Sequence, residues 1–203
     1  MKRPFYTLVA ALTWPVVWGL YRLRTTGREH LPQTGGFVLS ANHTSNFDPW
    51  PLCLPLWPRR QARFMAKSEL YNPILKPFLN AAGAFPVRRG QGDIEAMANA
   101  VEIVRGGEIV VMFPEGTRRK KGLRKKFEAR PHAGAARIAL EGGVPLVPAA
   151  IKGTDRLARL GPFRVAYGPP IPLDDLRGLD LREAAQTATE RLMAKIRELE
   201  ASL

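Results

Sequence analysis

A histidine and an aspartate stand five residues apart in the stretch Asn42–Asp48, and together these two residue types can move a proton. A neutral imidazole accepts a proton near neutral pH. A carboxylate on its other ring nitrogen fixes the tautomer and stabilises the imidazolium that forms. We therefore predict that His43 is a general base oriented by Asp48. The substrate would bring its own hydroxyl as nucleophile, so no serine or cysteine of the chain is needed.

The residues on either side predict the elements that position this pair. Residues 37–41 (FVLSA) are an apolar run that follows two glycines and predicts a buried strand. Pro49 suits the first position of a helix. The turn between strand and helix can then fold the carboxylate onto the ring. The alternative is structural: His43 is a surface histidine and Asp48 a helix N-cap.

Two further strands are predicted to end in polar turns. Residues 83–89 form a short strand that ends in two arginines, and the apolar strand at 108–113 leads into Pro-Glu-Gly-Thr-Arg at 114–118. In open α/β sheets ligands bind outside the carboxyl ends of the strands. These turns and His43 are therefore expected to form one site. Paired guanidinium groups can clamp a phosphate, although adjacent arginines are also typical of solvated surface.

The whole pattern predicts an α/β fold in a single domain, with a mixed central sheet flanked by helices. Two prolines in the strand at 144–151 indicate a position near a sheet edge or a bulge. The other predicted strands and helices, taken from apolar runs and helical periodicity, are strands at 62–66 and 163–167 and helices at 74–82, 94–105, 133–140 and 181–203. The last helix is assigned to packing.

The N-terminal residues predict contact with a membrane. Residues 4–21 carry no charge and are flanked by basic residues. The stretch is a little short of the roughly 20 residues that a spanning helix needs, and Pro15 interrupts it. Its tryptophans and tyrosines favour the lipid–water boundary. We expect residues 1–21 to be a bent, membrane-associating helical segment that dips into one leaflet. The alternative is a core helix.

Charge and composition limit the classes of partner that the chain is expected to bind. A formal net charge of +13 calls for an acidic partner, either nucleic acid or an anionic membrane surface. Residues 118–130 hold eight basic residues and one acid, a pattern typical of a solvated loop. Without an aromatic ladder or a zinc-finger spacing, nucleic acid is the weaker choice. A single cysteine, Cys53, excludes an internal disulfide, and no metal site is expected.

Four segments in order resemble the glycerophospholipid acyltransferase family. They are the His-x-x-x-x-Asp block at 42–48, the Gly…Arg strand end at 83–89, Phe-Pro-Glu-Gly-Thr-Arg at 113–118 and the apolar strand ending in proline at 144–148. The resemblance implies that residues 22–203 are an acyltransferase domain. One departure stands at 130–133 (RPHA), where many members carry a lysine, so the donor and the headgroup preference stay open.

The resemblance implies a reaction and a set of residue roles. A fatty acyl chain would pass from acyl carrier protein or coenzyme A to the free hydroxyl of lysophosphatidic acid, without a cofactor. His43 would take the hydroxyl proton and Asp48 would orient the ring. Arg89, Arg118 and Lys67 would hold the acceptor's phosphate. Glu115 and Gly116 would position its glycerol part. The substrate-binding residues implied are Lys67, Arg89, Glu115, Gly116, Thr117 and Arg118.

The implied partners are a lysophospholipid, an acyl thioester and an anionic membrane, at the cytoplasmic face of the cell membrane, with a peripheral or monotopic attachment. Three alternatives stay open. The acceptor is another lysophospholipid or a lyso-aminolipid. Water replaces the lipid hydroxyl, which makes the protein a hydrolase. In the third, the chain is a basic nucleic-acid-binding protein without catalysis.

Overall fold

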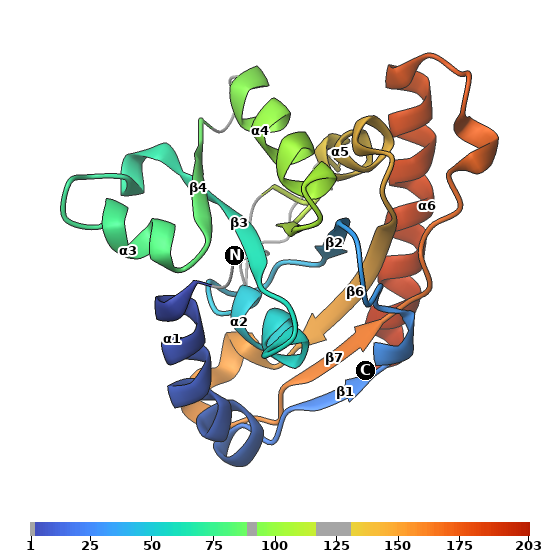
Figure 1. Ribbon diagram of the computed structural model, residues 1–203. Helices are drawn as coiled ribbons and strands as arrows, with labels where there is room; N and C mark the ends of the chain where they lie inside the picture. Colours follow the sequence, from blue (N-terminus) through green and yellow to red (C-terminus); the bar gives the residue numbers. More distant parts are fainter. Residues whose placement is uncertain (1–2, 89–92, 117–130) are drawn as a thin grey trace, which may run out of the picture.

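Figure 1 shows a computed structural model of the chain, in which helices cover a twisted central sheet. The structure describes residues 3–88, 93–116 and 131–203. The sheet has seven strands in the order β1-β7-β6-β2-β5-β3-β4. Their bounds are β1 (Arg24–Thr26), β2 (Phe37–Ala41), β3 (Ala62–Lys67), β4 (Ala84–Val87), β5 (Ile109–Met112), β6 (Leu146–Lys152) and β7 (Arg164–Tyr167).

The sheet is mixed, as predicted. Strands β6, β2, β5, β3 and β4 run parallel to one another, and β7 pairs antiparallel with β6. Strand β1 is parallel to β7 at the other edge. The carboxyl ends of the five parallel strands therefore meet at one edge of the sheet, where a ligand site is expected.

Strand β2 lies in the middle of the sheet, and all five of its residues are buried. Alternate side chains of a strand point to opposite faces. Phe37 and Leu39 accordingly join one apolar cluster and Val38 joins the other. A strand buried on both faces reads as a continuous apolar run, which explains why its bounds could be predicted.

Helices cover both faces of the sheet. Helices α4 (Ile94–Arg105), α5 (Gly134–Gly142) and α6 (Leu181–Ala201) pack on the Val38 face. The Phe37 face carries α1 (Pro4–Pro15) and α2 (Pro49–Cys53), while α3 (Lys76–Ala81) lies beside α1. The short helical turns are η1 (Val16–Leu20), η2 (Arg28–His30), η3 (Leu54–Leu56), η4 (Ser68–Leu70), η5 (Thr154–Arg159) and η6 (Asp174–Leu176).

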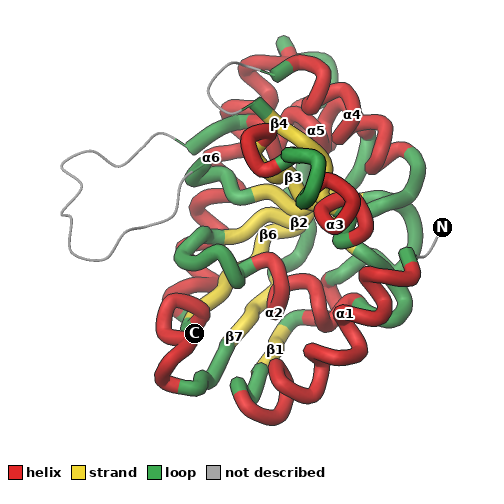
Figure 2. Tube along the Cα trace, turned by 90° about the vertical axis from the view of Figure 1, so that its left-hand side faces the viewer, coloured by secondary structure: helices red, strands yellow, loops and turns green. Residues whose placement is uncertain are grey.

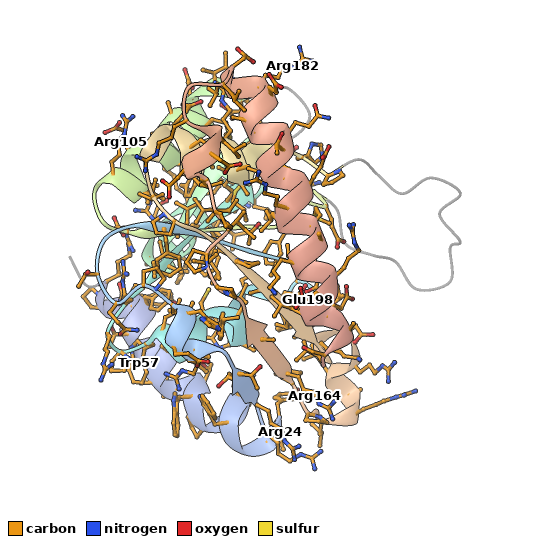
Figure 3. The ribbon with its side chains drawn as sticks, turned by 90° about the vertical axis from the view of Figure 1, so that its right-hand side faces the viewer. Arg24, Trp57, Arg105, Arg164, Arg182 and Glu198 are labelled. Atoms are coloured by element: carbon orange, nitrogen blue, oxygen red, sulfur yellow. The ribbon has the colours of Figure 1, made fainter. Side chains whose placement is uncertain are left out.

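The C-terminal helix α6 has the packing role predicted for it. Its N-cap, Asp180, accepts hydrogen bonds from the backbone N–H groups of Arg182 and Glu183. Figure 3 looks onto this helix, with Arg182 near its first turn. The residues at helical spacing that face the sheet are buried: Ala184, Ala188, Leu192 and Ile196. Truncation of a buried leucine such as Leu192 to alanine is expected to cost about 2–5 kcal/mol.

The predicted position of the proline-containing strand near an edge is wrong. Strand β6 lies inside the sheet, between β2 and β7. Its ladder with β7 ends at the pair Ala149–Tyr167, and the next residue, Pro148, accepts a hydrogen bond from the N–H of Gly168 at 2.9 Å. The missing proline N–H therefore falls where the ladder stops, so an interior strand tolerates it.

The N-terminal segment is helical, as predicted, and continues past Pro15 as the π-helical turn η1. Tyr6, Ala10 and Val17 are buried in the cluster on the Phe37 face, so the segment packs on the domain. Its outer face exposes Leu8, Leu12, Trp14, Val16 and Leu20. In the described part of the chain, no helix has both the length and the apolar character needed to cross a membrane. Contact with a membrane surface stays a prediction.

Candidate active site

The loop that contains the candidate site follows strand β2. Its first residue, Asn42, is held in place by its side chain. The buried Asn42 side chain donates to the carbonyl of Ile151 at 2.9 Å and accepts from the N–H of the same residue at 2.8 Å. These two bonds extend the pairing of β2 with β6 beyond the strand, with the side chain of Asn42 in place of its backbone. Asn42 belongs to the predicted motif, but no role was foreseen for it.

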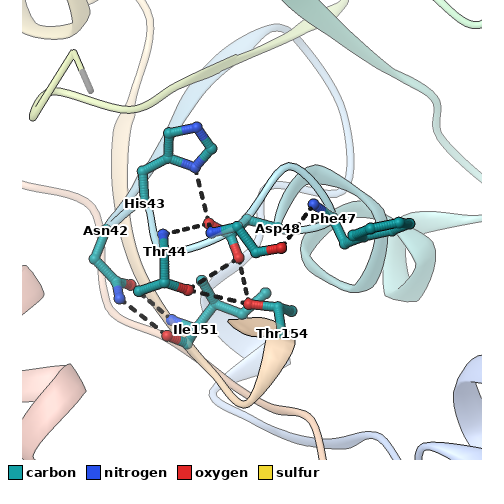
Figure 4. A network of polar contacts seen from close by, with 8 residues as sticks. Asn42, His43, Thr44, Phe47, Asp48, Ile151 and Thr154 are labelled. Carbon is teal, nitrogen blue, oxygen red and sulfur yellow. Dashed lines mark hydrogen bonds and ion pairs between the residues drawn. The ribbon is translucent and has the colours of Figure 1, made fainter. Parts of the chain in front are cut away.

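The histidine and aspartate form the predicted pair. Nδ1 of His43 lies 2.8 Å from Oδ2 of Asp48. Asp48 is completely buried and only 9% of His43 is exposed. An ionised carboxylate is an acceptor only, so Nδ1 carries the proton and Nε2 has a free lone pair. Figure 4 shows Nε2 on the side of the ring that faces away from Asp48. The pair is therefore arranged as a general base with its orienting carboxylate.

The carboxylate of Asp48 is held by its own loop. The backbone N–H groups of Thr44 and Ser45 donate to Oδ2 at 2.6 and 2.8 Å, and the Thr44 hydroxyl donates to Oδ1 at 3.2 Å. Burial raises the pKa of this carboxyl, but the hydrogen bonds from the ring, the hydroxyl groups and the backbone outweigh burial and keep the pKa below its usual value. Asp48 is therefore ionised at neutral pH.

A threonine that follows another strand also donates to this carboxylate. Thr154 lies just beyond β6, at the start of η5, and its buried hydroxyl donates to Oδ1 of Asp48. Sequence reasoning missed this residue. Its signal was available, because a polar residue follows Gly153 at the end of an apolar strand. The position of that strand next to β2 could not be read from the chain.

The structural alternative for the pair is wrong. Asp48 does occupy the N-cap position of α2, but its side chain makes no capping hydrogen bond. It turns back to the N–H groups of Thr44 and Ser45 instead (Figure 4). His43 is buried and is not a surface histidine.

The turn after β5 lies against the histidine ring. Strand β5 pairs with β2, and Phe113 stacks on His43 with the ring centroids 4.2 Å apart. The turn closes with a hydrogen bond of 3.0 Å from the N–H of Gly116 to the carbonyl of Phe113. The turn that contains Glu115 and Gly116 therefore begins at the residue that stacks on the predicted base. Phe113 is the first residue of the motif at 113–118, which predicted no role for it. Its stacking limits rotation of the histidine ring.

The backbone of Gly116 has a positive φ of +66°, a conformation that favours glycine. A Cβ at this position would also lie 2.5 Å from Cδ2 of His132. The N–H of His132 donates to the carbonyl of Pro114 at 2.8 Å. His132, which stands in the stretch that departs from the family pattern, is thus a neighbour of the predicted acceptor site.

Of the three basic residues predicted to bind the substrate, only Lys67 lies among the described residues. Lys67 is the last residue of β3 and is exposed at the same sheet edge, with β5 between its strand and β2. Arg88, after β4, is exposed and pairs with Asp93 and Glu95. The predicted substrate residues Arg89, Thr117 and Arg118 lie outside the described residues.

Other chemistry is not evident among the described residues. No three His, Cys, Asp or Glu side chains there group as a metal site requires. Cys53 is buried in the core, as predicted, and burial raises the pKa of its thiol well above its usual value. A thiol in this environment stays protonated and unreactive.

Comparison with known proteins supplies relatives for this geometry. The family model described as Acyltransferase matches residues 22–152. The chain is 33% identical over 185 residues to the 1-acyl-sn-glycerol-3-phosphate acyltransferase of Bacillus subtilis, covering 89% of both chains. It is 28% identical to the chloroplastic enzyme of that name from Brassica napus, of which it spans 46%. The crystal structure of the LPA acyltransferase PlsC from Thermotoga maritima matches 96% of this chain and 79% of its own, with a TM-score of 0.67 and 25% identity.

Proposed function

Since this chain belongs to the acyltransferase family and is an O-acyltransferase, we propose that it moves a fatty acyl chain from an acyl thioester to the free hydroxyl of lysophosphatidic acid, giving phosphatidic acid. One observation carries the proposal: the hydrogen bond of 2.8 Å between Nδ1 of His43 and the buried, ionised Asp48. The relatives named for this activity support the acceptor.

The chemistry follows from the free Nε2 of His43. This nitrogen takes the proton of the acceptor hydroxyl as the oxygen attacks the thioester carbonyl carbon. The tetrahedral intermediate then collapses, the C–S bond breaks, and the proton passes from Nε2 to the departing thiolate. Asp48 stays ionised throughout and stabilises the imidazolium between these two transfers. A thioester is already activated, so the base and the positioning of substrates suffice.

The acceptor's headgroup would lie over the carboxyl ends of the strands next to β2. Glu115 and Gly116 follow β5, beside His43, and with Thr117 would position the glycerol. Lys67 ends β3, and Arg89 and Arg118 come after β4 and β5 in the sequence. These cations would hold the phosphate. Guanidinium forks match phosphate oxygens and make this assignment chemically favourable.

We further propose that the N-terminal segment, α1 with η1, holds the protein on the cytoplasmic face of the cell membrane, peripherally or as a monotopic protein. Its outer face is apolar, and its C-terminal end is followed by the exposed Arg22 and Arg24. Figure 3 shows Arg24 next to Arg164, its register partner on β7. Cations beside an apolar face suit anionic headgroups.

The experiment is an assay of purified protein with labelled acyl donor, lysophosphatidic acid and extraction of the lipid products. Labelled phosphatidic acid is expected, from acyl carrier protein, from coenzyme A or from both. A panel of other lysophospholipids and a lyso-aminolipid tests the acceptor. Free labelled fatty acid without an acylated lipid would show a hydrolase and contradict the proposal.

A further inference from the structure

The segment from η4 to α3 exposes large apolar side chains that the fold itself does not use. Ile74 is 76% exposed and Phe78 57%, and no residue of α3 is buried. In Figure 1 this segment projects from the β4 edge of the sheet. We name as the α3 surface its four exposed apolar residues, Leu70, Ile74, Leu75 and Phe78. Large apolar side chains exposed together on one short segment are typical of a contact site.

The α3 surface continues the outer face of the N-terminal helix. The ring of Phe5, on α1, meets the ring of Phe78 edge to face, with the centroids 6.1 Å apart. Helix α1 also contacts α2, where the indole N–H of Trp50 donates to the Thr13 hydroxyl at 2.8 Å. Figure 2 shows α1, α2 and α3 grouped on one side of the molecule. The three helices therefore present one broad face.

The loop that carries His43 and Asp48 leads directly into α2, one of these three helices. Asp48 immediately precedes α2, and Phe47, the residue before it, is 53% exposed. Figure 4 shows the Phe47 ring directed away from the network around Asp48. An apolar side chain thus stands in solvent one residue from the catalytic carboxylate, on the loop that carries the base.

The charge of the segment selects the partner. The segment from η4 to α3 holds one acid, Glu69, against the exposed Lys67 and Lys76, and the sequence then contains no aspartate or glutamate from 70 to 92. The chain as a whole carries a formal net charge of +13. Apolar side chains beside an excess of cations suit an anionic lipid surface, which attracts each basic residue near it.

We propose that the α3 surface is a second membrane-docking element, which enters an anionic bilayer alongside α1 and sets the active-site loop on the lipid. The proposal rests on the proposed function, because a lysophospholipid acceptor lies in the bilayer. Two elements on either side of a loop fix its orientation, whereas one helix alone leaves the molecule free to rotate about its axis. The acceptor would then reach His43 without leaving the membrane.

The test is flotation of the full chain with vesicles of phosphatidylcholine and phosphatidylglycerol, without acyl substrates. Ile74→Asp and Leu70→Asp are each expected to lower the vesicle-bound fraction at least about tenfold, through lost apolar burial and added charge repulsion. Leu179→Asp is the matched control, because Leu179 has the same exposed fraction as Leu70, 46%, and lies two residues before α6. It is expected to bind as the unmodified chain does. Circular dichroism and a melting curve confirm folding.

Several results would overturn the proposal. They are no binding of the unmodified chain, equal loss in Leu179→Asp, or unchanged binding of both α3 variants. A dimer of the unmodified chain that Ile74→Asp converts to a monomer would assign the surface to a second copy. Activity on a short-chain, monomeric acceptor separates the two proposals. Loss of vesicle binding with this activity retained supports the docking surface, and absence of the activity from the unmodified chain contradicts the proposed function alone.

Discussion

The hydroxyl of Thr154 donates a hydrogen bond to the carboxylate of Asp48, although 106 residues separate the two in the chain. Strand β6 lies beside β2 in the sheet and brings them together. The orientation of His43, the proposed general base, thus depends on a residue outside the motif that contains it. Thr154 is a positioning residue, because it acts through Asp48.

Thr154→Val is expected to lower kcat roughly tenfold, since the carboxylate loses a buried donor and holds the imidazole less firmly. Thr154→Ser keeps the hydroxyl and is expected to restore most of the activity. The control is Thr189→Val. Thr189 is also buried, but its hydroxyl donates to the carbonyl of Ala185 in its own helix, α6, and not to Asp48. Steady-state rates with melting curves check this. Equal losses in the serine and valine variants would remove the hydroxyl from the mechanism.

The depressed pKa of Asp48 predicts how stability depends on pH. A carboxyl whose folded pKa lies below its unfolded value contributes stability above the unfolded pKa, and the contribution is lost as pH falls through the folded pKa. The loss for Asp48 should therefore occur below about pH 4. Urea unfolding at pH 6 and pH 3 should show that Asp48→Asn is less stable than the unmodified chain at pH 6, with the difference reduced at pH 3. A difference that does not change with pH would contradict the hydrogen-bonded, ionised carboxylate.

Gly116→Ala tests the turn beside the base. The variant combines a positive φ with a clash against His132, so it should lose about 1–2 kcal/mol of stability or more and raise the KM for the acceptor. Gly143→Ala is the matched control. Gly143 has a similar φ, +64°, but nothing lies within 4 Å of the position of its Cβ. It should show the backbone strain alone and normal kinetics. Similar kinetics in the two variants would separate the turn from acceptor binding.

Much of this fold could be predicted from local patterns. The bounds of β2 at 37–41 and of α4 at 94–105 agree with the predictions, because an apolar run and a helical period with a glycine stop are both local signals. The His43–Asp48 contact could be predicted for the same reason, since one turn contains both residues.

What could not be predicted depends on strand order. The interior position of β6, the anchoring of Asn42 on Ile151 and the bond from Thr154 all follow from the β2–β6 pairing, which joins segments about a hundred residues apart. The N-terminal segment shows a second limit. An uncharged apolar stretch such as 4–21 predicts a helix but not which face the domain buries, and the structure buries Tyr6 and Ala10 while it exposes Leu8 and Leu12.

The most direct measurement is the acyl-transfer rate of His43→Ala with lysophosphatidic acid and an acyl thioester, in protein shown to be folded by circular dichroism. A general base contributes at least about a hundredfold, so kcat should fall by that factor or more. The KM for the acceptor should change little, because the imidazole acts on the hydroxyl proton and not on the phosphate. A folded variant that turns over at nearly the normal rate would contradict the role of His43 and with it the proposed reaction at this site.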